Sequence, residues 1–560
     1  MKKKKSPVKV VVPLILAVAA AGVGYKVVNR YIPSKEVMDG NEYFGTFGGE
    51  DAAVVLPDRL EQGKALVKDG TAYVEYATAK ENLNDHLYKS DEEQQVILTT
   101  AVDIIKLPYD SNEYTTLTGN GSMPYQIVVS QDGNVYIALD YLAQYTALQY
   151  SVEQEPLHII INNQWGMKTF SDVIKEESVR LDADIKSPIL KKEAVGDKVT
   201  VLEQEEEWTK VLTADGYIGY MKSKKLSDSY EEQVTSDFRA AEYTSIHKDY
   251  DMNLLWHQVT SQDSNDALAA DIQDVKGVNV ISPTWFSISS NDGDISSLAS
   301  SDYVDTAHQN DMEVWGLMDN FSTDIDTDTV LGTTTSRENL EGQLITEALN
   351  YQLDGINIDI ESLPEETSES YVQFMRELSV KCRNNNLVLS VDVPPPYSFN
   401  EHYSQKELGE VVDYVIIMGY DEHYVGSDAG SVASLSYERD GITGTLENVP
   451  KEKIISGIPF YTRLWKTNAS GEVSSEAIGM DKADQILSDY KVTAGWSSET
   501  SQDAEFTDED GNFCQIWLEN EASIEEKMKL VQEYGLAGVA EWKLGFERSS
   551  IWDVIAKYVN

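Results

Sequence analysis

The alternation of strand-like and helix-like segments after residue 250 is the feature that most constrains the fold of this 560-residue chain. Short apolar runs, typical of buried parallel strands, are separated by segments in which apolar residues return every three or four positions. The runs begin at Asn253, Gly277, Glu313, Leu353, Leu387, Val411, Lys453 and Gly535. Eight strand–helix repeats over roughly 310 residues predict an α/β fold, a (β/α)8 TIM barrel with its active site at the C-terminal strand ends.

An open, doubly wound sheet is the alternative arrangement of the same repeats. Such a sheet ordinarily carries a glycine-rich phosphate-binding loop, and neither GxGxxG nor GxxxxGK[ST] occurs here at a strand end. The helix-like segment after the fourth strand places Cys382 on the same apolar face as Tyr371 and Leu378. That face predicts a core position for Cys382, so we expect no disulfide with Cys514.

The fourth strand of the predicted barrel carries polar residues that could take part in catalysis. Three isoleucines at alternate positions face the helices, and the polar residues between them, Asn357, Asp359 and Glu361, face the barrel interior. Two carboxyl groups two residues apart on one face repel each other, which raises the pKa of one of them. Glu361, at the open end of the barrel, is therefore a candidate general acid.

The string DGINIDIE of this strand resembles the DGxDxDxE signature of glycoside hydrolase family 18. The resemblance extends over about residues 245–560: strand six ends in MGYD, strand seven carries GIPFY, and strand eight ends in Trp542, in the family's order. Residues 466–522, between strands seven and eight, resemble the α+β insertion that deepens the cleft in this family.

The resemblance implies a role for each residue at the strand ends. Glu361 would protonate the glycosidic oxygen, while the 2-acetamido oxygen of the substrate attacks the anomeric carbon and the configuration is retained. Asp359 would hydrogen-bond the acetamido N–H and stabilise the developing positive charge. Tyr420 would donate to the acetamido group, and Asp421 would support that arrangement.

The resemblance also suggests residues that bind the sugar. Met418 belongs to the strand-six motif, and Trp542 would form the floor of a sugar subsite, with a role in the barrel core as the alternative. Tyr461, Arg463, Trp285 and Trp465 are candidates for binding outer sugars, and structural roles fit them equally well.

Asn357 departs from the family pattern, because chitinases of the family usually have Asp at this position. We expect its amide, beside Asp359, to favour the ionised form of Asp359 and thereby a protonated Glu361. The NIDIE variant resembles the branch directed at spore cortex and peptidoglycan, whose members cleave after N-acetylglucosamine.

Two further domains are predicted upstream. In residues 38–165 an Asp69-Gly70 turn recurs at Asp132-Gly133, each time followed by helix-like and strand-like stretches. This duplicated α+β domain resembles the copper amine oxidase N-terminal-like domain. We expect a stalk or adhesion module without copper, because the region holds only His86 and His158.

Residues 175–228 predict five short strands and resemble a bacterial Src-homology-3-like domain, with an acidic linker at 227–248. Such domains often bind cell-wall peptides or pack against a catalytic domain. The aromatic side chains of Trp208, Tyr217 and Tyr220 would either line a ligand groove or fill a small β-barrel.

Residues 1–30 predict export of the chain. Four lysines precede an apolar run from Val10 to Tyr25, which suits a transmembrane anchor with a cytoplasmic basic tail or a cleaved signal peptide. The net charge of −50 disfavours binding to nucleic acid. Two cysteines and seven scattered histidines predict neither a metal site nor a cofactor.

Together these features predict an exported glycosidase that cleaves β-1,4 bonds in a glycan containing N-acetylglucosamine, with peptidoglycan as the first candidate. A secreted chitinase and a non-catalytic carbohydrate-binding protein are the alternatives. The predicted anchor and Asn357 argue against the former, and the presence of Glu361 argues against the latter.

Overall fold

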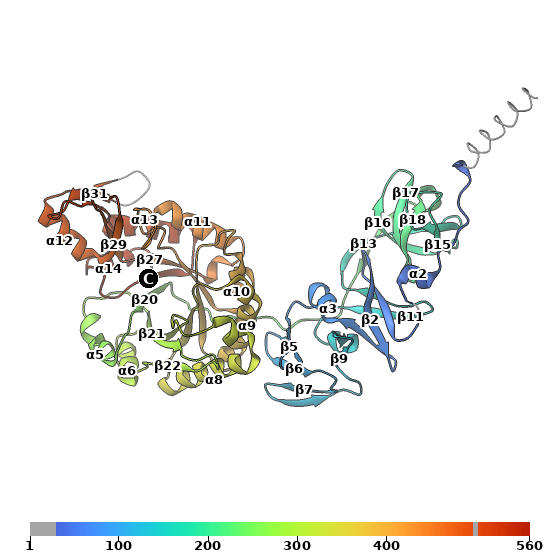
Figure 1. The fold of residues 1–560 in the computed structure, drawn as a ribbon, viewed down its shortest axis with the longest axis horizontal. Helices are drawn as coiled ribbons and strands as arrows, with labels where there is room; N and C mark the ends of the chain where they lie inside the picture. The colour runs from blue at the N-terminus through green and yellow to red at the C-terminus, as the bar shows by residue number, and fades with distance from the viewer. Residues whose placement is uncertain (1–29, 47, 497–501, 560) are drawn as a thin grey trace, which may run out of the picture. The chain divides into compact units, whose positions relative to one another are not determined.

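The computed structural model describes residues 30–46, 48–496 and 502–559, which form two compact units. The first unit contains the described residues up to 87 together with 105–240, and the second contains 88–104 and the chain from 241 onward (Figure 1). The predicted basic tail and membrane segment lie outside the described residues, apart from Arg30. Within the described ranges, no helix has both the length and the apolar character needed to cross a bilayer.

One sheet of the first unit confirms the predicted sequence repeat. Asp69-Gly70 and Asp132-Gly133 form the turns of two hairpins, and all four residues have positive φ, as a type I′ turn requires. A short helix follows each hairpin, and the two hairpins pair through β3 and β10. The sheet order is β11-β12-β1-β2-β3-β10-β9. The elements are α2 Gly40–Phe44, β1 Asp51–Val55, β2 Leu60–Lys68, β3 Thr71–Glu75, α3 Tyr76–Asn82, β6 Ile104–Pro108, β7 Glu113–Thr116, β8 Gly119–Ser122, β9 Val128–Gln131, β10 Asn134–Ala138, α4 Leu139–Leu142, β11 Gln149–Gln154 and β12 Leu157–Asn162.

The second sheet of this unit contains the five predicted short strands and two more. Its order is β15-β14-β18-β17-β16-β13-β19. The last strand lies within the predicted linker, because residues 230–234 pair along β13. The strands are β13 Gly166–Asp172, β14 Glu177–Arg180, β15 Ile189–Glu193, β16 Lys198–Gln204, β17 Trp208–Leu212, β18 Ile218–Lys222 and β19 Tyr230–Val234.

The two sheets share one apolar core, which decides the role of two predicted groove residues. Helix α2 places Tyr43 and Phe44 against the ring of Tyr217, with ring centroids 5.3 and 4.9 Å away. Trp208 is buried, and the ammonium group of Lys222 lies 3.9 Å from its ring centroid. The rings of Tyr217 and Trp208 therefore fill the protein interior rather than an open groove. Tyr220 is half-buried.

The second unit contains the predicted barrel. Eight parallel strands close on themselves in the order β20, β21, β23, β24, β25, β26, β27 and β33, and β20 pairs with both β21 and β33. All eight predicted runs form barrel strands, so the closed barrel is confirmed and the open sheet is excluded. The strands are β20 Met252–His257, β21 Val280–Ile288, β23 Glu313–Asp319, β24 Gly355–Asp359, β25 Val388–Val393, β26 Tyr414–Met418, β27 Ile454–Pro459 and β33 Gly538–Trp542, with a short β22 Ile295–Ser297 added to β21.

The helices form the outer layer of the barrel (Figure 1). Ile356, Ile358 and Ile360 lie in the core between strands and helices, whereas Trp256, Leu317 and Ile416 fill the barrel interior. Cys382 is buried in the outer core, and both cysteines are free, as predicted. The helices are α5 Gln262–Asp271, α6 Ser301–Gln309, α7 Thr327–Gly332, α8 Thr334–Tyr351, α9 Ser368–Asn384, α10 Gln405–Val411, α11 Leu435–Leu446, α13 Glu521–Tyr534 and α14 Ile551–Ile555.

The predicted insertion between the last two barrel strands is present and begins earlier than expected. Its sheet, in the order β29-β28-β32-β31-β30, starts at Tyr461, two residues after β27 ends. The apolar run from Lys453, predicted as a single strand, forms a barrel strand and the first strand of the insertion. The elements are β28 Tyr461–Thr467, β29 Val473–Gly479, α12 Met480–Tyr490, β30 Gly495–Trp496, β31 Gln502–Thr507 and β32 Phe513–Trp517.

A segment from the predicted stalk belongs to the barrel unit. Residues 88–104, with β5 Gln95–Thr99 and most of β4 Leu87–Ser90, pack Tyr88, Ile97 and Ile104 against Val380 of α9. The Tyr88 hydroxyl donates to the carbonyl of Gly332, at the end of α7, over 3.1 Å. The barrel is thus completed by residues that lie more than a hundred positions upstream in the sequence.

Glu93 of this segment caps α8. Its Oε1 accepts hydrogen bonds from the Thr335 N–H, at 2.9 Å, and from the Thr335 hydroxyl, at 2.7 Å. Partial burial alone would raise the pKa of Glu93, but the hydrogen bonds from Thr335 and Ser90 lower it from 4.5 to about 2. The positive end of the helix dipole favours an anion at this position.

Replacing Glu93 with Gln should lower the free energy of unfolding of the barrel unit by about 1 kcal/mol at pH 7, because the carboxylate is partly exposed and screened. The lowered pKa of Glu93 stabilises the fold above pH 4.5 and loses that effect as the pH falls toward 2. Urea melts of both proteins should therefore differ at pH 7 and converge as the pH falls to about 2. Glu92→Gln, at the exposed neighbouring position, is the control; an equal loss there would contradict the capping role.

Candidate active site

The C-terminal ends of neighbouring barrel strands bring three aspartates to one level. Ser287 of β21 is paired with Asp319 of β23, and Asp319 is paired with Asp359 of β24. The register of β24 with β25 then places Asp392 beside Asp359. All three carboxyl groups are buried, at 6%, 6% and 1% exposure for Asp319, Asp359 and Asp392. The mouth of the barrel therefore holds a row of acids that are too close together to be ionised at once.

Glu361 lies in the loop after β24, where other side chains fix its backbone. Asn320 Oδ1 accepts a hydrogen bond from the Glu361 N–H and Nδ2 donates to the Glu361 carbonyl, each at 3.0 Å. Two residues on, the N–H of Leu363 donates to the Tyr403 hydroxyl at 3.2 Å. The Glu361 side chain is exposed at the mouth. Because its backbone is fixed, the exposed carboxyl group of Glu361 is already positioned when a substrate binds.

The environment raises the pKa of both carboxyl groups at the end of the fourth strand, Glu361 and Asp359. Although Glu361 reaches solvent, dehydration by surrounding protein atoms raises its pKa most, and the charges of Asp421 and Asp319 add to the effect. Burial raises the pKa of Asp359 well above its usual range, and repulsion from Asp392, Glu361 and Asp319 raises it further. Glu361 therefore keeps its proton to a higher pH than an ordinary glutamic acid, as a general acid needs.

Asn357 is buried in the barrel interior and contacts Asp392 rather than Asp359. Its Oδ1 accepts hydrogen bonds from Trp256 Nε1, at 3.0 Å, and from the Ser282 hydroxyl, at 3.1 Å. Its Nδ2 donates to Asp392 Oδ1 at 2.8 Å. The expected donation of this amide to Asp359 is therefore replaced by a hydrogen bond to Asp392. Residues two apart on a strand are separated by about 6.6 Å and neighbouring strands by about 4.8 Å, so the amide meets the next strand first.

Tyr420 and Asp421 follow β26 and face the same cavity mouth. The ring of Tyr420 packs edge-on against Trp256 and Tyr461, with centroids 6.3 Å from each. Burial raises the pKa of Tyr420 well above 10, and Asp392 and Asp359 raise it further, so its hydroxyl keeps the proton that it would donate. The contact of this hydroxyl with an acetamido group stays a prediction.

Asp421 is held from the insertion side by two residues that were predicted to bind outer sugars. The Tyr461 hydroxyl donates to Asp421 Oδ1 over 2.6 Å, and Arg463 Nη2 lies 3.7 Å from the same oxygen. Both side chains are buried. They therefore orient Asp421, and their burial favours the structural role that the sequence left open over a contact with outer sugars.

Trp542 and Met418 end two barrel strands and are both half-buried. The ring of Trp542 packs against Trp256 at 6.0 Å between centroids and borders Tyr461. Part of each side chain remains accessible at the mouth. One part of the Trp542 ring thus packs in the barrel core and another part is accessible, and its contact with a sugar stays a prediction.

Trp285 and Trp465 lie in the protein core, which favours the structural role that the sequence left open for both. Trp285 is buried, and its Nε1 donates to Asn265 Oδ1 of α5 at 2.9 Å. A register shift in β21 between Thr284 and Phe286 accompanies this placement, and such bulges leave no signal in a simple alternation pattern. Trp465 is also buried and donates to the Gly430 carbonyl at 2.9 Å.

Sequence reasoning missed Asp319, Asn320 and Asp392. Each lies at the C-terminal end of a run that was correctly predicted as a strand, in EVWGLMDN or LVLSVDV. Asp319 Oδ2 accepts a hydrogen bond from the Ser287 hydroxyl at 3.0 Å. A polar residue that ends an apolar strand in a TIM barrel is the signal that could have identified them.

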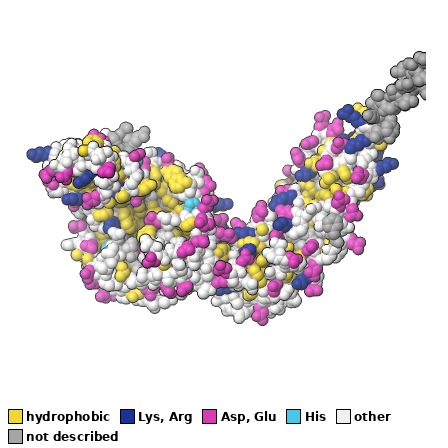
Figure 2. Space-filling view, in the orientation of Figure 1, with side chains coloured by type: hydrophobic (Ala, Val, Ile, Leu, Met, Phe, Trp, Pro, Cys, Tyr) yellow, Lys and Arg dark blue, Asp and Glu magenta, His cyan; other side chains and the backbone are white. Residues whose placement is uncertain are grey.

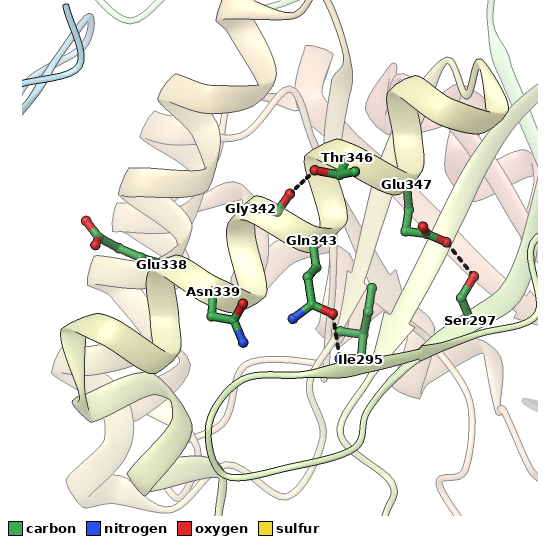
Figure 3. A pocket seen from close by; sticks show the side chains of 8 residues that line it. All are labelled: Ile295, Ser297, Glu338, Asn339, Gly342, Gln343, Thr346 and Glu347. Carbon is green, nitrogen blue, oxygen red and sulfur yellow. Dashed lines mark hydrogen bonds between the residues drawn. The ribbon is translucent and has the colours of Figure 1, made fainter.

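A separate pocket lies between α8 and β22 and has a different character (Figure 3). The Ser297 hydroxyl donates to Glu347 Oε2 at 2.7 Å, and the Ile295 N–H donates to Gln343 Oε1 at 3.3 Å. These polar groups attach the β22 segment to the helix. We assign no ligand to this pocket.

Acidic side chains are spread over the visible face of both units (Figure 2), in line with the net charge of −50.

Comparison with known proteins identifies two domains. Residues 315–547 match the family "Glycosyl hydrolases family 18", and residues 178–227 match "Bacterial SH3 domain". The resemblance of residues 38–165 to the copper amine oxidase N-terminal-like domain stays a prediction.

Two curated relatives are both from Bacillus subtilis (strain 168). The chain is 26% identical to "Uncharacterized glycosylase YvbX" over 293 residues, 50% of this chain and 84% of that protein. It is 27% identical to "Cortical fragment-lytic enzyme" over 240 residues, 41% of this chain and 56% of that protein. The match thus spans little more than half the length of the second relative.

One solved structure confirms the fold. The C-terminal domain of a putative chitinase from Desulfitobacterium hafniense DCB-2 superposes with a TM-score of 0.52 at 22% identity, covering 56% of this chain and all of that domain. Together with the acid-lined mouth of a closed barrel, the family match identifies a glycosyl hydrolase family 18 domain at residues 315–547, which a bacterial SH3 domain precedes at residues 178–227.

Proposed function

We propose that this protein is an exported glycosidase that cleaves β-1,4 bonds in a glycan containing N-acetylglucosamine, with peptidoglycan as its substrate. The observation that carries the proposal is the position of Glu361, a carboxyl group with a raised pKa fixed at the open mouth of a closed barrel above a buried row of acids. A non-catalytic carbohydrate-binding protein would not need an acid held in this state.

The proposed mechanism is substrate-assisted and retaining. Glu361 gives its proton to the glycosidic oxygen as the bond to the leaving sugar breaks. The acetamido oxygen of the substrate attacks the anomeric carbon and forms an oxazolinium ion, which Asp359 stabilises and Tyr420 orients. A water molecule, deprotonated by Glu361, then attacks the anomeric carbon, which opens the oxazolinium ring and restores the acetamido group.

Three features support peptidoglycan over chitin. One relative is named a cortical fragment-lytic enzyme, and Asn357 matches the variant expected of the peptidoglycan-directed branch. The SH3 domain belongs to a class whose members often bind cell-wall peptides. A basic flank and an apolar run at the N-terminus support export, with either an anchor or a cleaved signal peptide. A catalyst tethered near an insoluble polymer works at a high effective concentration.

The proposal is tested by digesting purified peptidoglycan and chitin oligomers and identifying product ends by mass spectrometry. We expect ends with terminal N-acetylglucosamine from peptidoglycan, and proton NMR should show the β-anomer first. An N-deacetylated glycan should react at least about a thousandfold more slowly, since it lacks the nucleophile. Preferential release from chitin would instead indicate a chitinase. Undiminished cleavage of the deacetylated glycan would contradict substrate assistance.

Exposed aromatic side chains mark where a long glycan would extend beyond the central subsite. Phe321, Phe399 and Tyr424 lie on the loops after β23, β25 and β26, and Phe399 is 76% exposed. The ring of Phe399 stacks on Tyr397 with centroids 5.6 Å apart. Such faces suit the apolar side of a pyranose ring.

Replacing Phe399 with Ala should raise KM for polymeric peptidoglycan about tenfold and leave kcat within about twofold. The ring would contribute equally to binding the substrate and the transition state, so its loss weakens both to the same extent. Initial rates on polymer and on a disaccharide glycoside would separate the two parameters. Leu349→Ala, at an exposed apolar position in the last turn of α8, is the control. Unchanged KM in the Phe399 variant would place the glycan elsewhere.

A further inference from the structure

Asp392, at the end of β25, is a buried acid in the active site that the mechanism above leaves without a role. Only 1% of it is exposed, and its Oδ1 accepts a hydrogen bond from Asn357 Nδ2 at 2.8 Å. It is also the charged group with the largest effect on the Tyr420 hydroxyl. Asp392 therefore lies among the groups that would surround the acetamido sugar.

Asp392 and Asp359 are neighbours on adjacent parallel strands, whose backbones are about 4.8 Å apart. Both side chains point into the barrel, and both carboxyl groups are more than nine-tenths buried. Among the described groups that shift their pKa values, none is a cation. Two adjacent buried carboxyl groups without a counter-ion cannot both be ionised near neutral pH and titrate as a pair.

Hydrogen bonding decides which member of the pair holds the proton. Asn357 donates to Asp392, which favours the anion there. Asp359 Oδ1 is buried and has no hydrogen-bond partner among the described residues. An unpartnered oxygen in a dry site is more stable when its carboxyl group is protonated, so the proton belongs mainly to Asp359.

The other charged or titratable groups around the pair do not remove this constraint. Asp319, on β23, accepts hydrogen bonds from the Ser287 hydroxyl and the Phe321 N–H and adds negative charge. Glu361, beyond β24, also adds negative charge when it ionises, and Tyr420, after β26, stays neutral. Tyr371 of α9 and Tyr403 after β25 have raised pKa values as well and stay neutral.

We propose that Asp392 is a positioning residue that shares one proton with Asp359, so that the pair presents a single negative charge to the reacting sugar. The inference rests on the proposed function, because it assigns the pair to the stabilisation of the oxazolinium ion. The second carboxyl group of the pair comes from β25, since position 357 on β24 holds an amide. Sharing keeps one negative charge in place at pH values where an isolated buried aspartic acid would be neutral.

The pH profile of kcat/KM on peptidoglycan tests the proposal. In Asp392→Asn, Asp359 must ionise alone in its dry site, so the acidic limb should move up by about one pH unit or more, with kcat at least about tenfold lower. The exchange variant N357D/D392N returns a second carboxyl group to this position and should recover most of both changes. Asp354→Asn, just before the other end of β24, should leave the acidic limb in place.

An acidic limb that stays within about 0.3 pH units in Asp392→Asn would overturn the inference, as would an exchange variant no better than the single one. Thermal melts identify variants that fail to fold. If a variant fails to fold, infrared spectra of wild-type protein labelled with 13C-aspartate replace its pH profile as the test. They should show a neutral carboxyl band at pH 7 that is absent from Asp359→Asn, and its absence from the wild type refutes the shared proton.

These experiments separate the inference from the proposed function. If the wild type releases no products from any glycan, the proposed function fails, while the infrared band still reports on the pair. If the wild type is active and neither the acidic limb nor the band behaves as expected, only the shared proton is wrong.

Discussion

Replacing Glu361 with Gln should reduce kcat on peptidoglycan at least about a thousandfold, with KM changed less than about threefold. The amide fills the same space but has no proton to give to the leaving oxygen, and general acid catalysis contributes between about a hundredfold and ten thousandfold. Release of reducing ends, followed with purified enzyme and purified cell-wall glycan, measures the effect. Thermal melts should be unchanged within about 2 °C, because the backbone of Glu361 is held by Asn320 and not by its own side chain.

Glu365→Gln is the matched control for this variant, because it makes the same chemical change on an exposed glutamate of the same loop. Its activity should equal that of the wild type. Equal release of reducing ends by the Glu361 variant and the wild type would mean that another group protonates the leaving oxygen. The assignment of the active site would then be wrong, whatever the family match.

Replacing Arg337 with Met should destabilise the barrel unit by about 3–5 kcal/mol, the largest stability effect that we expect from one substitution. Arg337 of α8 is fully buried, and its Nε and Nη2 donate to Glu377 of α9 at 2.7 and 3.2 Å. Its Nη1 donates to the Leu331 carbonyl at 2.7 Å, and its guanidinium lies 4.8 Å from the Tyr88 ring centroid. Without it, a buried carboxylate loses its counter-ion.

Urea denaturation, monitored by tryptophan fluorescence, measures the loss. Burial alone would raise the pKa of Glu377, but Arg337 lowers it. The stabilisation is therefore complete above the unfolded-state pKa and is lost as the pH falls through the lowered value, so the gap between variant and wild type should narrow in acid. Lys276→Met removes an exposed ion pair with Asp553 and should cost less than about 0.5 kcal/mol. A similar loss of unfolding free energy in both variants would show that burial does not explain the contribution of the Arg337–Glu377 pair.

The local pattern of the sequence was enough to predict much of the active site. The alternation in DGINIDIE separates the isoleucines of the outer core from Asn357 and Asp359 of the interior, and the structure has this separation. The same reasoning left the role of Trp285 open, because a register shift in β21 changes the direction of side chains without a clear mark in the sequence. It also left the roles of Tyr461 and Arg463 open, because their burial depends on how the insertion packs.

The amino-acid sequence by itself determined the eight strands, their inward and outward faces, and the position of Glu361 at an open end, because these follow from periodicities of two and about 3.6 residues along one segment. Only the tertiary structure decided that Asp392 lies beside Asp359, that Arg337 pairs with Glu377, and that residues 88–104 complete the barrel. These contacts join segments that lie 33, 40 and nearly 300 positions apart in the chain. Strand register and helix packing bring them together, and neither leaves a periodic signal in the sequence.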